Sequence, residues 1–145
     1  MTLETLFDIA SLTKPMATAS AIAVLLAEGK ISQEQTVSQH LSDFGRRDSR
    51  RITVEQLLLH TSGLPRVGPL SQMERGRQTA LALVAAMRLV AVPGRRFEYS
   101  DLGYFVLGEL IAKVSNSTLD AFTKARLFEP LGMRDTHYYV TPADV

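Results

Sequence analysis

Ser11 and Lys14 are the two residues of this chain whose types and spacing most directly suggest chemistry. They lie three positions apart, so on a helix they share one face and are separated by about one turn. A serine beside a lysine can act as a nucleophile, because a lysine whose pKa is depressed by burial can take the hydroxyl proton. The resulting alkoxide can attack an acyl carbon. Taken alone, the tetrapeptide favours the alternative, a helix cap followed by a solvated lysine.

The residues that follow Lys14 favour the nucleophile over the helix cap with a solvated lysine. Pro15 has no N–H and is tolerated only in the first turn of a helix, which predicts that Ser11 lies at a helix N-terminus. The unpaired N–H groups there favour negative charge beside the hydroxyl. Within the run from Pro15 to Glu28, residues Met16 to Ala27 are apolar or small all round, which predicts a helix buried on every side that ends at Gly29. We expect this run to be too short to span a bilayer.

The composition restricts the class of protein. A chain of 145 residues can form one domain with a real core, and 46% hydrophobic with 21% charged residues is typical of a soluble globular protein. The net charge of +1 gives no argument for binding nucleic acid or an anionic membrane. The absence of cysteine excludes disulfides, thiolate metal sites and a cysteine nucleophile. The first residues lack a basic leader, so we expect no secretion signal, which slightly favours a cytoplasmic location and leaves the compartment open.

Start and stop signals along the chain predict a mostly helical structure with too little strand to make a sheet. Four pairs are spaced as capping boxes or similar helix starts: Thr36 with Gln39, Thr53 with Gln56, Ser71 with Glu74, and Ser117 with Asp120. The helices expected from these signals and from apolar periodicity cover residues 54–60, 71–89, 102–114 and 119–128. Residues 3–9 are expected to be extended, and residues 136–140 are expected to form a strand or an extended loop.

Other polar groups give weaker signals. The arginine-rich stretch 45–51 could grip phosphate, but a solvated loop is the preferred interpretation. His60 precedes Thr-Ser-Gly at a predicted helix end, and we interpret it as a hydrogen-bonded histidine that shapes the turn rather than as a catalytic base. His40 and His137 are isolated, and no group of residues has the spacing of metal ligands.

Four ordered segments together resemble the serine β-lactamase-related family. They are Ser-Leu-Thr-Lys at 11–14, Leu-Leu-Leu-His-Thr-Ser-Gly-Leu-Pro at 57–65, Pro-Gly-Arg-Arg-Phe-Glu-Tyr-Ser-Asp at 93–101, and Phe-Glu-Pro-Leu-Gly-Met at 128–133. That family includes class C β-lactamases, penicillin-binding D-alanyl-D-alanine peptidases and related esterases. The resemblance covers nearly the whole chain and is far more specific than one tetrapeptide.

The resemblance implies that Ser11 is the acylated nucleophile, Lys14 its proton partner and Tyr99 the second proton carrier, with no cofactor and no metal. The role suits Tyr99 physically. A phenol titrates near 10 in water, and an adjacent lysine cation would favour the phenolate. The phenolate could then take the proton from Ser11 and hand it to the leaving group.

Asp101 departs from the family pattern, in which Asn is the commoner third residue of the Tyr-Ser-Asn motif. An amide can donate a hydrogen bond to a substrate carbonyl, whereas an ionised carboxylate cannot. Asp101 could instead pair with Lys14 and hold it charged, which would weaken the lysine as a base. This possibility favours ester over β-lactam substrates, with Asp101 as a substrate-binding residue. The alternative, in which Asp101 only caps a helix, has equal weight.

The family fold packs a helical region against a mostly antiparallel sheet. The resemblance implies that residues 1–145 are a partial domain, the helical part of this α/β β-lactamase/transpeptidase-like fold, truncated at both ends and without the third motif, Lys-Thr-Gly or His-x-Gly. We expect a serine hydrolase of esters, or else amides, in a fragment with little or no turnover. The alternative is a non-catalytic helical module that binds a partner. We expect a small-molecule ester or amide as partner, no nucleic acid, no membrane, and self-association through an exposed apolar face.

Overall fold

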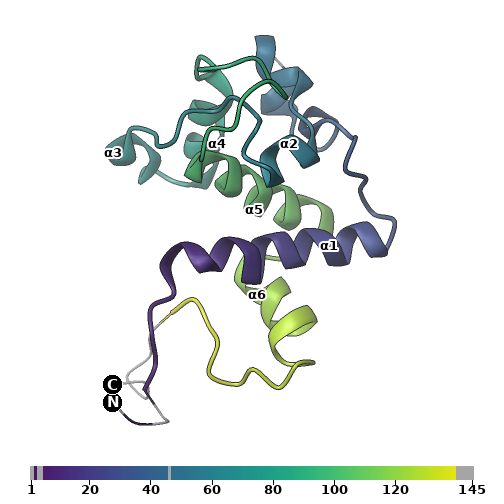
Figure 1. Ribbon diagram of the computed structural model, residues 1–145, viewed down its shortest axis with the longest axis vertical. Coiled ribbons are helices and arrows are strands. Elements are labelled where there is room, and N and C mark those ends of the chain that lie inside the picture. Colours follow the sequence, from purple (N-terminus) through teal and green to yellow (C-terminus); the bar gives the residue numbers. More distant parts are fainter. Residues whose placement is uncertain (1, 3–4, 46, 140–145) are drawn as a thin grey trace.

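The computed structural model describes residues 2, 5–45 and 47–139, and these form a set of short and long helices (Figure 1). Within them there is no β-strand, and one isolated antiparallel bridge joins Thr36 to Thr53. The α-helices are α1 Ser20–Ala27, α2 Val54–Leu58, α3 Leu70–Met73, α4 Arg77–Ala86, α5 Asp101–Ser115 and α6 Leu119–Thr123. Short 3-10 turns cover Ala10–Leu12, Val37–Gln39, Ser42–Gly45 and Arg47–Arg51, and π-helical segments cover Lys14–Ala19 and Lys124–Phe128. The prediction of a mostly helical chain is confirmed.

Helix α5 is the centre of the arrangement. It contacts α1, α2, α4 and α6. In Figure 1, α1 crosses the middle of the molecule beside α5, α2 to α4 gather on the far side of α5, and α6 lies beyond α1. Because α1 follows the Ser11–Lys14 motif and α5 begins at Asp101, the packing of these two helices brings the two motifs together.

The first helix of the chain differs from the regular α-helix that was expected. It begins as a 3-10 turn at Ala10–Leu12, widens into a π-helix over Lys14–Ala19, and becomes α-helical only at Ser20. The widening begins next to Pro15, which cannot donate to the carbonyl of Ser11. The Ser20 hydroxyl donates to the Pro15 carbonyl at 3.0 Å within the widened turn. Single π turns of this kind are frequent at functional sites.

The prediction that this helix is buried on every side is wrong for this chain. Ala21, Ile22 and Leu25 are fully buried, but Met16 is 43% exposed and Ala23 lies at the surface. The apolar run was expected to be too short to span a bilayer, but by length and composition alone the 18 residues Ala10–Ala27, with mean hydropathy 1.4, could cross a membrane. This is weak evidence for a membrane span, because the core helix of a soluble protein meets the same criterion.

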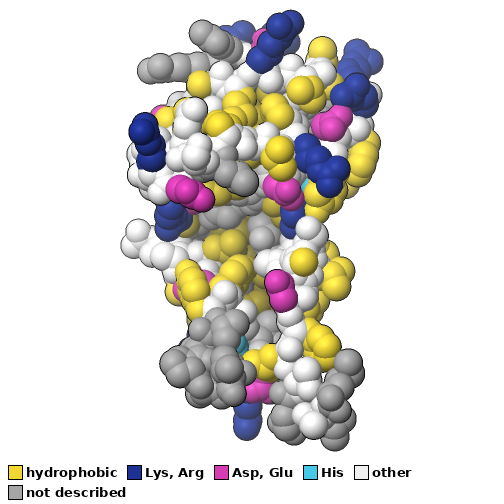
Figure 2. All heavy atoms as spheres, turned by 90° about the vertical axis from the view of Figure 1, so that its left-hand side faces the viewer, with side chains coloured by type: hydrophobic (Ala, Val, Ile, Leu, Met, Phe, Trp, Pro, Cys, Tyr) yellow, Lys and Arg dark blue, Asp and Glu magenta, His cyan; other side chains and the backbone are white. Residues whose placement is uncertain are grey.

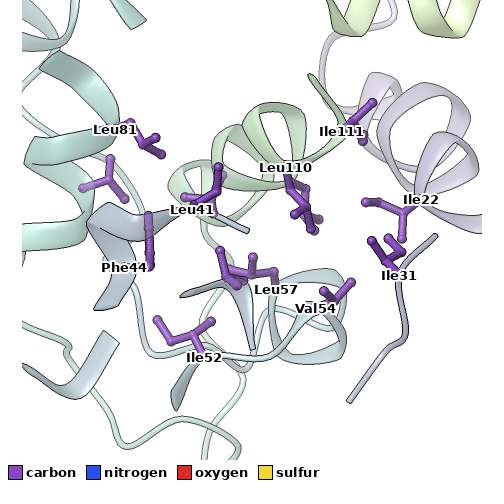
Figure 3. Packing of buried hydrophobic residues seen from close by; sticks show 14 of the residues in the cluster. Ile22, Ile31, Leu41, Phe44, Ile52, Val54, Leu57, Leu81, Leu110 and Ile111 are labelled. Atoms are coloured by element: carbon purple, nitrogen blue, oxygen red, sulfur yellow. The ribbon is translucent and has the colours of Figure 1, made fainter. Parts of the chain in front are cut away.

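One hydrophobic cluster joins the elements around α5 (Figure 3). Ile22 from α1, Leu57 from α2 and Leu110 from α5 are fully buried in it. Its other fully buried large side chains include Leu25, Val37, Phe44, Ile52, Val54, Leu64, Val84, Leu107 and Ile111. Close packing at these positions fixes how α1 and α5 cross, and therefore how the two motifs face each other.

Two helix starts follow the sequence signals closely. Thr53 and Gln56 form a complete capping box, with each side chain bonded to the other residue's backbone N–H, at 3.2 and 3.1 Å. Helix α5 extends one residue beyond the predicted range at each end, and its N-cap is Ser100, whose hydroxyl accepts the Gly103 N–H at 3.1 Å. The cap at this helix is therefore Ser100 and not Asp101.

Other boundary predictions are wrong. Thr36 makes no cap bond and precedes only a 3-10 turn. The helix expected over 71–89 is divided into α3 and α4, because Gly76 between them has φ +122°, which lies outside helical geometry. Thr118 rather than Ser117 precedes α6. Of the two alternatives expected for residues 136–140, a strand or an extended loop, residues 136–139 form an irregular loop without a strand, and Val140 lies outside the described residues.

Candidate active site

The four residues predicted from the sequence gather around the ammonium group of Lys14. Its Nζ donates to the hydroxyl oxygen of Ser11 at 3.3 Å and lies 2.6 Å from a carboxylate oxygen of Asp101. The same nitrogen is 5.1 Å from the centre of the Tyr99 ring. Ser11 and Lys14 point to the same side of the first helix, as the spacing predicts, and the turn before α5 brings the other two residues to them.

Lys14 is not the neutral lysine that a direct base would require. Its side chain is only 16% exposed, and this burial alone would lower its pKa. The hydrogen bonds to Asp101 and Tyr99, with the negative charges of the same groups, outweigh burial and raise the pKa of Lys14 above its ordinary value. Lys14 is therefore a cation at neutral pH, contrary to the depressed pKa that the simplest Ser–Lys mechanism needs.

The pKa of Tyr99 is shifted in the opposite direction from that of Lys14. Hydrogen bonding to the Lys14 ammonium, and then to the Ser11 hydroxyl, lowers the pKa of Tyr99. Slight burial and the Asp101 charge oppose this effect without cancelling it. An adjacent lysine cation is expected to lower the pKa of a phenol in this way. Of the groups beside the Ser11 hydroxyl, Tyr99 is therefore the one whose deprotonated, basic form is stabilised by its surroundings.

Asp101 pairs with Lys14 and is not the helix cap, so the structure decides between the two interpretations that the sequence left open. The cap bond belongs to Ser100, a fully buried residue whose hydroxyl also donates to the Pro65 carbonyl at 2.6 Å. The Asp101 side chain remains 48% exposed, so the ion pair lies at the edge of the site and faces solvent. An ion pair this exposed stabilises the fold little, and its main effect is on the charge of Lys14.

The motif 57–65 supports the segment that carries Tyr99 through three backbone hydrogen bonds. The N–H of Glu98 donates to the His60 carbonyl at 2.7 Å, Gly94 to Thr61 at 2.8 Å and Val90 to Gly63 at 2.9 Å. The two segments approach so closely that a Cβ on Gly63 would lie 2.1 Å from the Ala91 carbonyl oxygen. With φ +76° as well, this position admits only glycine, which explains the Thr-Ser-Gly part of the motif.

His60 lies against the Tyr99 ring and not against the serine. Its Nδ1 accepts the backbone N–H of Ser100 at 3.0 Å, and its ring stacks on that of Tyr99 with centroids 4.5 Å apart. This agrees with the interpretation of His60 as a hydrogen-bonded histidine that shapes a turn. No local sequence pattern predicts this stacking, because the rings of residues 60 and 99 meet only through tertiary packing.

Two further residues near the site were not singled out from the sequence. Tyr104 lies one helical turn into α5, its hydroxyl donates to the Leu58 carbonyl at 3.2 Å, and its ring centre is 6.0 Å from Lys14 Nζ. The Arg66 guanidinium lies 5.8 Å from the Tyr99 ring centre. The spacing of Tyr99 and Tyr104 around a helix start, and the arginine directly after Pro65, are the only sequence signals that could have indicated them.

Ala10, which directly precedes the serine, has an unusual backbone. Its φ is +44°, in the left-handed region that residues with a Cβ rarely adopt. Its N–H donates to a carboxylate oxygen of Asp8 at 2.8 Å, which holds the bend. Backbone strain of this kind concentrates at functional sites, where the surrounding structure holds it in place.

The remaining candidates do not join the site. Within the described part of the chain, no group of three His, Cys, Asp or Glu residues could hold a metal. The arginine-rich stretch forms a 3-10 turn with Arg50 and Arg51 at the surface, and Arg46 lies outside the described residues. A hollow of about 470 Å³ lies between residues 6–9 and 135–138 and is not lined by Ser11, Lys14, Tyr99 or Asp101.

The whole chain, residues 1–145, matches the family model described as Beta-lactamase. The chain therefore belongs to the β-lactamase family, a family of hydrolases.

The similar proteins have several activities by name. The chain is 31% identical to N-acetylmuramyl-L-alanine amidase of Bacillus subtilis (strain 168), over 95% of this chain and 34% of that protein. It superposes on a class C β-lactamase with a TM-score of 0.88 and 25% identity, covering 100% of this chain and 40% of the other. It superposes on EstCE1, a hydrolase with promiscuous acyltransferase activity, with a TM-score of 0.83 and 30% identity, covering 99% and 42%. The chain thus spans about a third to two fifths of the length of these proteins.

Proposed function

We propose that this chain carries the nucleophile half of a serine hydrolase that forms an acyl-enzyme at Ser11 and prefers esters. The observation that supports this most directly is the arrangement around Lys14: its ammonium donates to the Ser11 hydroxyl at 3.3 Å while hydrogen bonding to the same ammonium lowers the pKa of Tyr99. A nucleophile, a base and a fixed cation are thereby in contact.

In the proposed reaction, the Tyr99 phenolate removes the Ser11 hydroxyl proton as the serine oxygen attacks the acyl carbon. The new C–O bond gives a tetrahedral intermediate with a negatively charged oxygen. This intermediate collapses, the bond to the leaving group breaks, and the Tyr99 phenol returns the proton to the departing oxygen. In the second half, Tyr99 takes a proton from water as the water oxygen attacks the acyl carbon. The second tetrahedral intermediate collapses, the bond between Ser11 and the acyl carbon breaks, Tyr99 returns the proton to the Ser11 oxygen, and the carboxylic acid leaves.

Lys14 acts as a permanent cation in this scheme and does not take the serine proton. Its raised pKa keeps it charged across the neutral range, and its charge stabilises the phenolate form of Tyr99. Asp101 contributes by holding Lys14 in place and charged. The serine proton therefore passes to the oxygen of the Tyr99 phenolate, which becomes a neutral phenol.

The preference for esters rests on Asp101. An asparagine in its place could donate an N–H to an amide carbonyl of the substrate, whereas the carboxylate offers only acceptors. The alternative, an amide substrate, is supported by a similar protein that is named an amidase. Acylation by matched ester and amide donors separates these two outcomes.

The direct test is covalent labelling of Ser11 in the 145-residue chain. A fluorophosphonate probe should give one adduct, located at Ser11 by mass spectrometry, and Ser11→Ala should abolish it. Tyr99→Phe should slow labelling by roughly 10²- to 10⁴-fold, the usual contribution of a general base. Ser71→Ala, an exposed serine on α3, is the matched control and should label at the original rate. Equal labelling of the Ser11→Ala variant would refute the proposal.

The second candidate is a non-catalytic module that binds a partner. Exposed apolar side chains beside the motif favour it, among them Leu12 at 60% and Phe97 at 65% exposed. If Ser11 stays unlabelled while the chain is folded, this candidate becomes the better one.

A further inference from the structure

We propose that His60 is a positioning residue for Tyr99, and that its neutral imidazole holds the phenol at the Ser11–Lys14 pair. This inference rests on the proposed function, in which Tyr99 moves the proton. No hydrogen bond joins His60 to Ser11 among the described residues, so the histidine acts through the tyrosine and is not itself a catalytic residue.

The contacts of the imidazole ring carry the argument. The Tyr99 ring stacks on it at a centroid distance of 4.5 Å and an interplanar angle of 30°. The Tyr104 ring lies 5.0 Å away, also at 30°, and Phe97 meets it edge-on at 5.8 Å. The side chain of Tyr99 is therefore supported by an aromatic group that is itself held by two other rings.

The hydrogen bond at Nδ1 defines the protonation state of His60. The donor is the backbone N–H of Ser100, the residue that directly follows Tyr99, at 3.0 Å. A backbone N–H can only donate, so Nδ1 must be unprotonated and the proton of the neutral ring lies on Nε2. A second proton on the ring would place two N–H groups against each other and release the backbone next to Tyr99.

The backbone of His60 holds the same segment. Its φ is +56°, and its carbonyl accepts the N–H of Glu98 at 2.7 Å. One residue thus binds the backbone on both sides of Tyr99, at residue 98 through its carbonyl and at residue 100 through its ring.

The charges that face the ring also keep it neutral. Burial, and then the Lys14 cation from the first helix, lower the pKa of His60, while Asp101 from α5 raises it. The other titratable groups in contact are Tyr99 and Tyr104, whose own pKa values are lowered and raised respectively. Glu98 reaches His60 through its backbone N–H. Protonation of His60 therefore occurs only below its ordinary pKa of about 6.5.

This arrangement has a kinetic signature in the labelling of Ser11. Below the pKa of Tyr99, the logarithm of the labelling rate should fall by one unit for each unit of pH. Below the pKa of His60 the slope should steepen to two, because both groups must then lose a proton. His60→Asn should keep a slope of one throughout, since asparagine tolerates positive φ and its oxygen can accept the Ser100 N–H but does not titrate.

His60→Ala, which offers no acceptor, should slow labelling by about tenfold to 10²-fold at all pH values, as expected when a catalytic group loses its position. His40→Asn is the matched control: it removes a histidine bonded to Gln35, away from the site, and should keep the steep acid limb. A steep limb retained in His60→Asn, or an unchanged rate in His60→Ala, would overturn the proposal.

Nitrogen NMR of the unsubstituted chain provides a test that does not depend on variants folding. At neutral pH the His60 ring should show an unprotonated Nδ1 and a protonated Nε2, and a proton on Nδ1 would contradict the assignment. Complete failure of Ser11 labelling in the unsubstituted chain would instead reject the proposed function, and the inference with it. Normal labelling with unaltered His60 variants would reject the inference alone.

Discussion

The ammonium nitrogen of Lys14 lies 2.6 Å from a carboxylate oxygen of Asp101, so the lysine that faces Ser11 is held as a cation. This pair changes the chemistry expected of a Ser-x-x-Lys motif. A lysine in this state stabilises negative charge on its neighbours and leaves proton transfer to the phenol of Tyr99.

Replacing Asp101 by Asn should alter both the charge balance and the choice of substrate. Asp101→Asn removes the anion that raises the pKa of Lys14 and adds an N–H donor at the edge of the site. We expect the ratio of Ser11 acylation by a β-lactam to acylation by an activated ester to rise. The measurement is the rate of each mass shift on the intact chain.

The matched control is Asp43→Asn, because Asp43 accepts a hydrogen bond from Gln78 at 3.2 Å and lies outside the site. It should leave the ratio unchanged. An equal ratio in Asp101→Asn and the original chain would show that the third residue of the motif does not select the acyl group.

The pH dependence of labelling should follow Tyr99 and Lys14. Because the environment lowers the pKa of Tyr99, the rate should rise with pH and level off below the phenol's ordinary value of 10. Because the pKa of Lys14 is raised, the cation and the rate should persist until the pH exceeds 10.5. Tyr99→Phe should remove the rising limb, whereas Tyr139→Phe, at an exposed tyrosine, should keep it. A rising limb in Tyr99→Phe would assign the base elsewhere.

Ser100 should matter for stability as well as for position. Ser100→Ala removes the cap bond to Gly103 and leaves the Pro65 carbonyl without its donor. We expect a loss of about 2 kcal/mol in the free energy of unfolding, roughly 1 from each bond. Urea unfolding measures it, and Ser71→Ala should change stability by less than about 0.5 kcal/mol. A similar small change for Ser100→Ala would mean that α5 does not depend on this cap.

Variants of Ala10, whose backbone is strained, should change the free energy of unfolding according to how well the new residue tolerates positive φ. Ala10→Gly should leave the free energy of unfolding unchanged or raise it by up to about 1 kcal/mol, since glycine accepts φ +44° but loses more entropy on folding. Ala10→Val should lower it by more than about 1 kcal/mol because a β-branched residue resists positive φ. Thermal unfolding of both variants measures the difference. Valine tolerated as well as glycine would argue that this residue is not strained.

The isolated chain should self-associate. Several large apolar side chains of its first residues are exposed: Leu6, Phe7, Ile9, Leu12 and Met16. Figure 2 shows that hydrophobic side chains are spread over both the upper and the lower part of the face that it draws. Together they should exceed the few hundred Å² of apolar patch usual for a monomer. Sedimentation velocity should show mass rising with concentration.

Phe7→Lys with Leu12→Lys should reduce this association more than Leu59→Lys, which replaces an exposed leucine after α2. A compact monomer at every concentration, with a cooperative unfolding transition, would contradict the prediction.

Local signals in the sequence predicted the helices that depend on local interactions. The capping box at Thr53 and the long helix α5 follow from side chains that bond to nearby backbone and from a regular apolar stripe. The π-helical segment Lys14–Ala19 could not be predicted, because a proline in the first turn is equally compatible with an ordinary α-helix. The break at Gly76 was missed because one glycine is weaker than the apolar pattern around it.

The site was predictable to the extent that its residues belong to motifs. The spacing of Ser11 and Lys14 predicted a shared face, and the family resemblance added Tyr99 and Asp101. Charge states were not predictable in the same way, because the raised pKa of Lys14 depends on which of two roles Asp101 takes. The stacking of His60 on Tyr99 depends on how the loop after α2 packs beside the start of α5, which no local pattern records.

Hydrogen–deuterium exchange of three amides around Tyr99, those of Glu98, Ser100 and Asp101, can report whether this segment stays folded. The amides of Glu98 and Asp101 are protected by carbonyls, of His60 and Arg66, whereas the Ser100 amide between them is protected by an imidazole nitrogen. Opening of the whole loop would expose all three amides together. If the protection factor fell at the Ser100 amide alone as the solution is acidified, the segment would have lost only its side-chain acceptor, the His60 ring, while the surrounding backbone hydrogen bonds stayed closed.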